Sequence, residues 1–151
     1  MNHAHLPRPP LILGAAGVLP PLLCVGLALV DPTLILPATI GGGLYDALIL
    51  SFLGGMWWME ALLRRDERGW PYLLAVLPSL IGWALLVPPL LAGGSFRIAL
   101  ILLGLVVMVS PLADARIGTA MRSLTGWAQL RWALSLGLGG LTLILGLIAP
   151  R

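Results

Sequence analysis

The sequence predicts an all-α integral membrane protein whose single domain is a bundle of five transmembrane helices. Of its 151 residues, 59% are hydrophobic and only 10% are charged, whereas about 25% of residues are charged in an average soluble domain. The mean hydropathy is +1.00. A soluble domain of this size could not bury so much apolar side-chain surface, so lipid must cover it. At roughly 20 residues per helix, the chain has room for several spans.

The first span is expected at residues 11–30, after a Pro-rich tail at residues 1–10. Asp31 and Pro32 end its apolar run. This run is longer than the roughly 7–15 apolar residues of a signal-peptide core, so we interpret it as a retained helix. Pro20 and Pro21 predict a kink, because proline removes a backbone donor and its ring clashes with the preceding turn.

The second span is expected at residues 44–63. No basic residue occurs between Thr33 and Leu63. A straight helix over that stretch would be about 46 Å long, against a hydrocarbon core of about 30 Å. Pro37 and the three glycines at residues 41–43 supply a break, so we expect an outer loop at residues 33–40.

Three further spans follow. The third is expected at residues 71–91, because Pro71 suits a first helical turn and pairs of prolines and glycines end the apolar run. Pro78 predicts a kink within it. The fourth span is expected at residues 96–113 and the fifth at residues 130–149. Between them, residues 115–129 combine arginines with apolar side chains at near-helical spacing, which predicts a short helix at the membrane interface.

The arginines predict the orientation of the bundle. The chain has nine arginines and no lysine, and five spans place seven of the arginines on the side of the N-terminus: Arg8, Arg64, Arg65, Arg68, Arg116, Arg122 and Arg131. Only Arg97 and Arg151 fall on the other side. Because basic residues are enriched in cytoplasmic loops, we expect a cytoplasmic N-terminus and a periplasmic C-terminus in the bacterial inner membrane. Most tryptophans fall near the inner interface, where an aromatic belt is typical.

Several runs within the spans resemble one little-studied family. The most specific run begins Tyr45-Asp46-Ala47, continues Leu-Ile-Leu-Ser-Phe-Leu-Gly-Gly, and is followed by Trp58. Weaker similarities are Gly14–Pro20, Leu77–Trp83 and the pair Leu130-Arg131. The family comprises bacterial five-span proteins of unknown function and includes mitochondrial transmembrane protein 69. Relatives often carry a polar or basic residue such as His at the position of Trp57. The resemblance implies the five-span architecture and no particular activity.

Two carboxylates lie inside the predicted spans, where ionisable groups are costly and are therefore functional candidates. Glu60 precedes Arg64 by four residues, the favoured order for a helical ion pair. Asp46 follows three glycines, so we expect it to accept hydrogen bonds from the free N–H groups at the start of the second span. The alternatives for Asp46 are an ion pair with Arg97 and a proton- or ligand-binding role. Arg131, which opens the fifth span, is a further polar candidate.

Small residues form stripes that predict close helix packing. Ser135, Gly139 and Gly146 share one face of the fifth span, and Ser51 and Gly55 are four residues apart in the second. Packing within the chain is the main interpretation, and contact with another subunit is the alternative. Trp58 and the mid-span Trp83 are the candidate ligand-contacting aromatics.

The sequence carries no pattern typical of catalysis or metal binding. A single cysteine, Cys24, excludes an internal disulfide and any multi-cysteine zinc or iron–sulfur site within one chain. Both histidines, His3 and His5, lie in the N-terminal tail, so no histidine is at membrane depth. No phosphate loop, zinc-protease motif or nucleophile elbow occurs. We expect no enzymatic activity, no cofactor and, because the arginines flank apolar segments, no nucleic-acid partner.

The expected function is that of a non-enzymatic accessory subunit or assembly factor of a membrane complex, because the loops are nearly bare and small-residue faces are available. Its partners would be the lipid bilayer and another membrane protein or a second copy of the chain. The alternative is a binder or transporter of an apolar or amphipathic small molecule such as a quinone, a lipid or a porphyrin. Kinked and broken helices, which the prolines predict, often line cavities.

Overall fold

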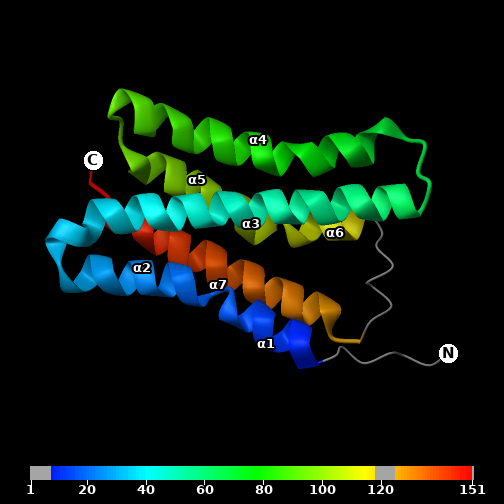
Figure 1. Cartoon of the computed structure of the whole chain (residues 1–151), viewed down its shortest axis with the longest axis horizontal. Helices are drawn as coiled ribbons and strands as arrows, with labels where there is room; N and C mark the ends of the chain where they lie inside the picture. Colours follow the sequence, from blue (N-terminus) through cyan, green and yellow to red (C-terminus); the bar gives the residue numbers. More distant parts are fainter. Residues whose placement is uncertain (1–7, 118–124, 151) are drawn as a thin grey trace.

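The computed structural model describes residues 8–117 and 125–150, and its architecture is all-helical, as predicted. Figure 1 shows the longest helices lying side by side along the longest axis. In chain order the elements are α1 (Arg8–Ala16), α2 (Leu19–Val30), the 3-10 turn η1 (Pro32–Leu34), α3 (Ile35–Leu63), α4 (Gly69–Ala92), α5 (Phe96–Val109), α6 (Pro111–Ile117) and α7 (Trp127–Ile148).

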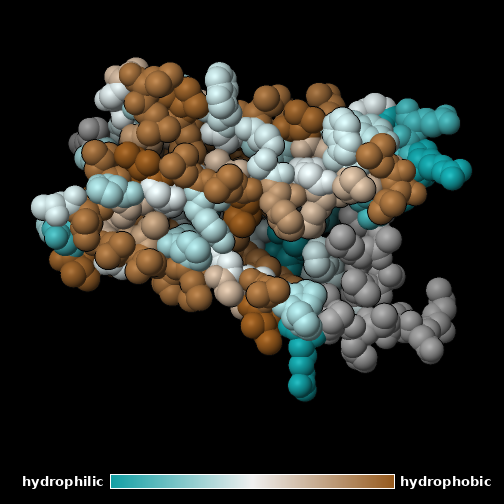
Figure 2. Space-filling view, viewed as in Figure 1, coloured by the Kyte–Doolittle hydropathy of each residue, from teal (hydrophilic) through white to brown (hydrophobic). Residues whose placement is uncertain are grey.

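Four to five segments of the described chain are long and apolar enough to cross a membrane. The helices α3, α4 and α7 each qualify alone, and α1 with α2 forms one further segment. The fifth is the pair α5 and α6, which meet at an angle of 42°. Large apolar side chains cover the outside of the bundle, as the brown surface in Figure 2 shows. This surface is the one that lipid would cover.

The first apolar segment is broken just before its proline pair. Helix α1 ends at Ala16 and α2 begins at Leu19, so Pro20 and Pro21 fall in the first turn of α2. Backbone N–H groups in a first turn have no acceptor within the helix, so the missing proline donors cost nothing there. The kink predicted at these prolines is therefore present as a short break between two helices.

Helix α3 corrects the expected outer loop. It runs without interruption from Ile35 to Leu63, so most of residues 33–40 is helical rather than a loop. Pro37 is tolerated because it lies in the first turn. Gly42 and Gly43 remain helical because they let other helices approach: a Cβ on Gly42 would lie 2.5 Å from a methyl group of Leu145. Tertiary packing thus outweighs the low helix propensity of glycine. At about 44 Å, α3 needs a tilt or an overhang to fit a bilayer.

Helix α4 agrees closely with the third span expected at residues 71–91 and contains three internal prolines. Pro78, Pro88 and Pro89 all lie inside the helix, which continues to Ala92 and ends at Gly93 in the left-handed conformation (φ +67°). Membrane helices tolerate internal proline because neighbouring groups satisfy the freed carbonyls. The left-handed glycine is a common helix terminator, since it lacks the Cβ that would clash there.

Close backbone contacts hold the bundle together. Helix α3 packs most extensively against α4, and α5 against α7. At the second crossing, a Cβ on Gly139 would lie 2.6 Å from the carbonyl oxygen of Gly104. At the first crossing, a Cβ on Gly54 would lie 2.2 Å from the carbonyl oxygen of Ala75. Only glycine permits approaches this close.

The expected fourth span is bent. Helix α5 ends at Val109, and α6 begins at Pro111, whose ring cannot continue the preceding helix. The bend turns Ser110 and Asp114 toward α7, as described below. Of the interfacial helix expected at residues 115–129, α6 covers the start and α7 covers the end. Residues 118–124 lie outside the described part of the chain.

Candidate functional site

A buried ion pair joins α6 to α7. Arg131 Nε lies 2.8 Å from Asp114 Oδ2, and the two side chains are only 8% and 11% exposed. Arg131 is in the second turn of α7, so the pair lies just inside the end of the bundle that holds the α3–α4 loop. Two charges withdrawn from water in this way are costly unless every donor and acceptor finds a partner.

Three further side chains complete the hydrogen bonding of this pair. Trp57 of α3 donates its indole N–H to Asp114 Oδ1 at 2.6 Å. The remaining guanidinium nitrogens of Arg131 donate to Ser135 Oγ at 2.8 Å and to Ser110 Oγ at 3.1 Å. Ser110 in turn donates to the carbonyl oxygen of Val107. These five side chains, called the buried polar network below, tie α3, α6, α7 and the α5–α6 junction together.

Sequence reasoning identified Arg131 and Ser135 separately and missed Asp114, Ser110 and Trp57 as their partners. A usable signal was present. Arg131 and Ser135 are four residues apart on one face of α7, and the same spacing separates Ser110 and Asp114. Trp57 is the position at which the chain departs from the polar residue expected from the resemblance, and its indole N–H supplies a hydrogen-bond donor there.

An apolar groove of about 710 Å³ lies beside the buried polar network, between α4 and the α5–α6 pair. Its floor is formed by Leu50 and Trp57 of α3, and the exposed Arg116 of α6 lies at its rim. The other lining residues are Trp70, Leu73, Leu74, Leu77, Pro78 and Ile81 of α4, with Val106, Val109, Ser110, Leu112 and Ala113 opposite. Trp57 and Ser110 thus belong both to the groove and to the network.

A smaller pocket, of about 90 Å³, is lined by the ion pair itself. Asp114 and Arg131 share it with Trp127 and Trp132 of α7. The network therefore lies between a large apolar groove and a small pocket that the two charged side chains help to line.

Asp46 is not at the start of a helix, which corrects its expected capping role. Because α3 begins at Ile35, Asp46 lies three turns inside it and is fully buried. Its Oδ2 and the hydroxyl of Thr142 on α7 share a hydrogen bond. Arg97 does not pair with Asp46: its guanidinium donates to the carbonyl oxygens of Leu147 and Ala149 and so caps the end of α7.

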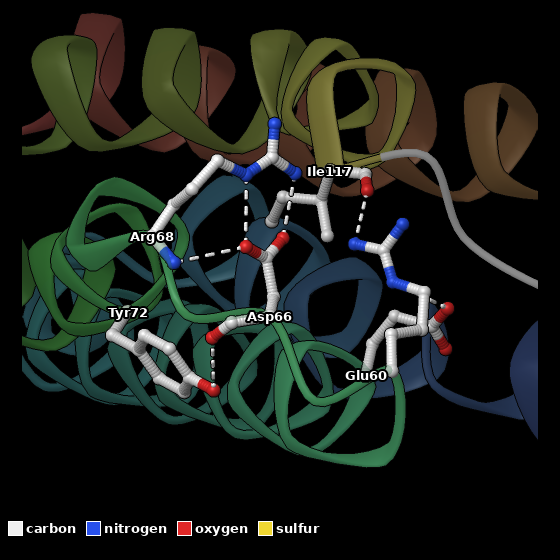
Figure 3. Close-up of polar contacts among 6 residues, drawn as sticks. Glu60, Asp66, Arg68, Tyr72 and Ile117 are labelled. Carbon is white, nitrogen blue, oxygen red and sulfur yellow. Dashed lines mark hydrogen bonds and ion pairs between the residues drawn. The ribbon is translucent and has the colours of Figure 1, made fainter.

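The predicted pair of Glu60 and Arg64 is formed, with Nε and Oε1 3.6 Å apart. Glu60 is buried rather than exposed on the surface. Arg64 also donates to the carbonyl oxygen of Ile117, which ties the end of α3 to the end of α6; Figure 3 shows both contacts.

The α3–α4 loop is held by Asp66. Arg68 donates to both carboxylate oxygens of Asp66, and Tyr72 donates to its carbonyl oxygen at 3.0 Å, as Figure 3 shows. The hydrogen bonds from Arg68 lower the pKa of Asp66 to about 2. Arg64, Arg65, Arg68 and Arg116 all lie at this end of the bundle, which we call the arginine-rich end. The largest hydrophilic cluster visible in Figure 2 lies there.

The two candidate aromatics do not line the groove. Trp58 packs edge-on against Tyr72, with ring centroids 5.1 Å apart, and Trp83 is 66% exposed on the outside of α4. Trp57 and Trp70 line the groove instead.

The small-residue stripes have different surroundings. Ser135, Gly139 and Gly146 are buried, and the two glycines lie against α5. Ser51 and Gly55 are exposed; Ser51 accepts a hydrogen bond from Ser79 of α4 at 3.1 Å, and Gly55 has open space beside it. Within residues 8–117 and 125–150, no three His, Cys, Asp or Glu side chains are grouped as metal ligands.

Comparison with known proteins places the chain in a family without an assigned activity. Neither a curated protein nor a solved structure matches it. The model of one family, described as "Protein of unknown function (DUF3429)", matches residues 6–148, which is most of the chain. The chain therefore belongs to this family of proteins of unknown function.

Proposed function

We propose that the protein binds an amphipathic small molecule of the membrane in the groove between α4 and the α5–α6 pair. The groove volume of about 710 Å³ falls within the roughly 300–1,000 Å³ typical of small-molecule sites. Its lining is apolar apart from a few polar groups, and such a composition is also typical of ligand sites. The proposed function involves no chemical reaction.

The observation that carries the proposal is the joining of an apolar groove to a rigid polar network at one end of a membrane bundle. Ser110 and Trp57 are held in place by the ion pair behind them. Arg116 supplies a positive charge at the rim, near the arginine-rich end. An apolar tail would lie along the groove, and a polar or anionic head would face Arg116.

The shape of the lining favours a chain-like tail. On α4 the lining residues run from Trp70 to Ile81 along one face, which is about 16 Å of helix. A lipid acyl chain or the isoprenoid tail of a quinone suits such a length better than a flat porphyrin ring does.

Tryptophan fluorescence tests this proposal in lipid nanodiscs. We expect quinones or bromine-labelled anionic lipids to quench the wild-type emission in a saturable manner, because Trp57 and Trp70 line the groove. Leu77→Trp would fill the groove and is expected to abolish saturable binding. Leu80→Trp is the matched control, since Leu80 is exposed on α4 and lies outside the groove lining. Equal saturable binding by both variants would contradict the proposal.

A role as an accessory subunit is a second proposal, favoured by the outer face of the α3–α4 pair. Ser51, Gly55 and Ser79 form a small, partly polar patch there, where another helix could approach closely. Gly55→Leu is expected to release a partner that co-purifies at fixed stoichiometry. Gly26→Leu is the control, because Gly26 of α2 also has open space beside it. Retention of the same partner by both variants would argue against this patch.

The orientation, the membrane and the closer kinship are proposals as well. The arginine-rich end supports a cytoplasmic N-terminus in a bacterial inner membrane. In a Cys24→Ser background, Arg65→Cys should react with a membrane-impermeant thiol reagent only from the cytoplasmic side, and Gly94→Cys only from the opposite side. The reverse labelling would overturn the orientation.

The run that begins at Tyr45 supports kinship with mitochondrial transmembrane protein 69.

A further inference from the structure

The carboxyl group of Asp46 lies in the interior of the bundle, and Asp46 is not among the residues that line the groove of the proposed function. Asp46 is completely buried. Oδ2 contacts the hydroxyl of Thr142, and Oδ1 has no hydrogen-bond partner. Among the residues that the structure describes, no arginine forms an ion pair with it. A carboxylate in these surroundings would be a buried, uncompensated negative charge.

Within residues 8–117 and 125–150, the groups that face Asp46 carry no positive charge. From α2, Cys24 lies close to the glycines that precede Asp46 on α3. The neighbouring Tyr45 donates its hydroxyl to the carbonyl oxygen of Gly17 and is thereby engaged elsewhere. From α7 the facing polar group is Thr142, and α4 and α5 contribute Leu86 and Leu100 beside Gly43.

Counting hydrogens at Thr142 points to a proton on Asp46. The hydroxyl oxygen of Thr142 contacts Asp46 Oδ2 and also the carbonyl oxygen of Leu138, at 2.9 Å. A hydroxyl has one hydrogen and can donate to only one of these acceptors. The carbonyl four residues earlier is the ordinary acceptor for a threonine within a helix. When that carbonyl takes the hydrogen, the second contact is a hydrogen bond only if Asp46 donates.

We propose that Asp46 is an intramembrane proton-binding site, whose carboxyl group holds a proton at neutral pH and donates it in a hydrogen bond to Thr142. The chain of donation then runs from Asp46 to Thr142 and on to the carbonyl oxygen of Leu138. The proton comes from hydronium, which leaves as water, and its release reverses that step.

Proton release would affect the α3–α7 contact. A Cβ on Gly42, one turn before Asp46, would lie 2.5 Å from Leu145, so the two helices leave little room for water beside the carboxyl group. A charged Asp46 would have to draw water in or separate these helices. Thr39, two turns earlier on the same face, is also buried and its hydroxyl has no partner. Its hydroxyl would be a further hydrogen-bond partner for water drawn into this interface.

Infrared spectroscopy of the full chain in lipid nanodiscs tests the proposal, because a protonated carboxylic acid has a C=O stretch well separated from the carboxylate bands. We expect this band at neutral pH, with a shift on transfer to D₂O. It should vanish in Asp46→Asn, which preserves the shape of the neutral acid. It should persist in Glu67→Gln, since Glu67 lies in the exposed α3–α4 loop.

A second variant keeps the assignment testable should Asp46→Asn not fold. Thr142→Val removes the acceptor, so the band should persist at a higher frequency because the acid loses its hydrogen bond. Absence of a protonated-acid band from the wild type at neutral pH would overturn the proposal. So would a band that survives in folded Asp46→Asn, or one that Thr142→Val leaves unshifted.

Discussion

Replacing Arg131 by methionine removes one half of the buried ion pair and leaves the other half in place. Methionine fills a similar volume but carries no donor, so Asp114 would keep only the hydrogen bond from Trp57. Its Oδ2, now bonded to Arg131 at 2.8 Å, would be a buried negative charge without a partner. Removal of one partner from such a pair typically costs about 3–5 kcal/mol of the free energy of unfolding.

The double variant Asp114→Leu with Arg131→Met removes both charges and should be more stable than Arg131→Met alone. Ser110 retains its bond to the carbonyl oxygen of Val107. The indole N–H of Trp57 would lose its acceptor, and one unsatisfied buried donor costs about 1–3 kcal/mol. We therefore expect the double variant to lie about 1–3 kcal/mol below the wild type.

Equilibrium unfolding in mixed detergent micelles, followed by circular dichroism, measures these differences. Arg116→Met is the control: Arg116 is exposed, and its replacement should change the free energy of unfolding by no more than about 0.5 kcal/mol. The reasoning would be refuted if Arg131→Met cost as little as Arg116→Met. It would also be refuted if the two changes at the ion pair were additive, because side chains that share a hydrogen-bond network must be coupled.

Three further predictions concern other contacts. Gly139→Leu should lower the melting temperature strongly, because a Cβ at Gly139 would meet Met108 and the carbonyl oxygen of Gly104. Gly140→Leu is the control and should have little effect, since Gly140 has open space beside it. Equal melting temperatures for the two variants would contradict the close α5–α7 crossing. Trp57→Phe should lower the free energy of unfolding by about 1–3 kcal/mol, because it leaves Asp114 Oδ1 without a donor. Trp57→His should retain part of that stability, since histidine can donate a hydrogen bond. Identical losses for the two variants in thermal unfolding would mean that the indole N–H is unimportant. The pKa of Asp66 is lowered in the folded state to about 2, so its contribution to loop stability should be full above the ordinary Asp pKa of 3.8 and should disappear as pH falls through about 2. Asp66→Asn should remove this pH dependence, as measured by proteolysis of the α3–α4 loop with an acid-active protease; an unchanged profile would contradict it.

The helical architecture could be predicted from the sequence because it follows from local composition. Apolar runs of sufficient length mark the helices, and the pair Pro20-Pro21 correctly marks a break. The extent of α3 could not be predicted, because its glycines look like a break until the facing side chain of Leu145 is known. The end of α4 was predicted to within one residue, because the glycines at residues 93 and 94 mark it in the sequence.

The candidate site was less predictable because its members come from four separate segments. Arg131 and Ser135 share one helical face and could be identified from spacing. Their pairing with Asp114 depends on the bend between α5 and α6, and the bond from Trp57 depends on how α3 packs beside that bend. For Asp46, local sequence alone gave a wrong prediction. Its neighbouring glycines suggested a helix start, whereas the helix begins three turns earlier and buries the carboxyl group.

Native mass spectrometry of the full chain, extracted in mild detergent from its own membrane, tests the central claim most directly. The proposed function predicts one bound amphipathic molecule per chain in the wild type and in Leu80→Trp, and none in Leu77→Trp. The mass of the retained molecule would also identify it as a lipid or a quinone. A wild-type chain that carries no small molecule, or a molecule retained equally by Leu77→Trp, would contradict the assignment of the groove as the binding site.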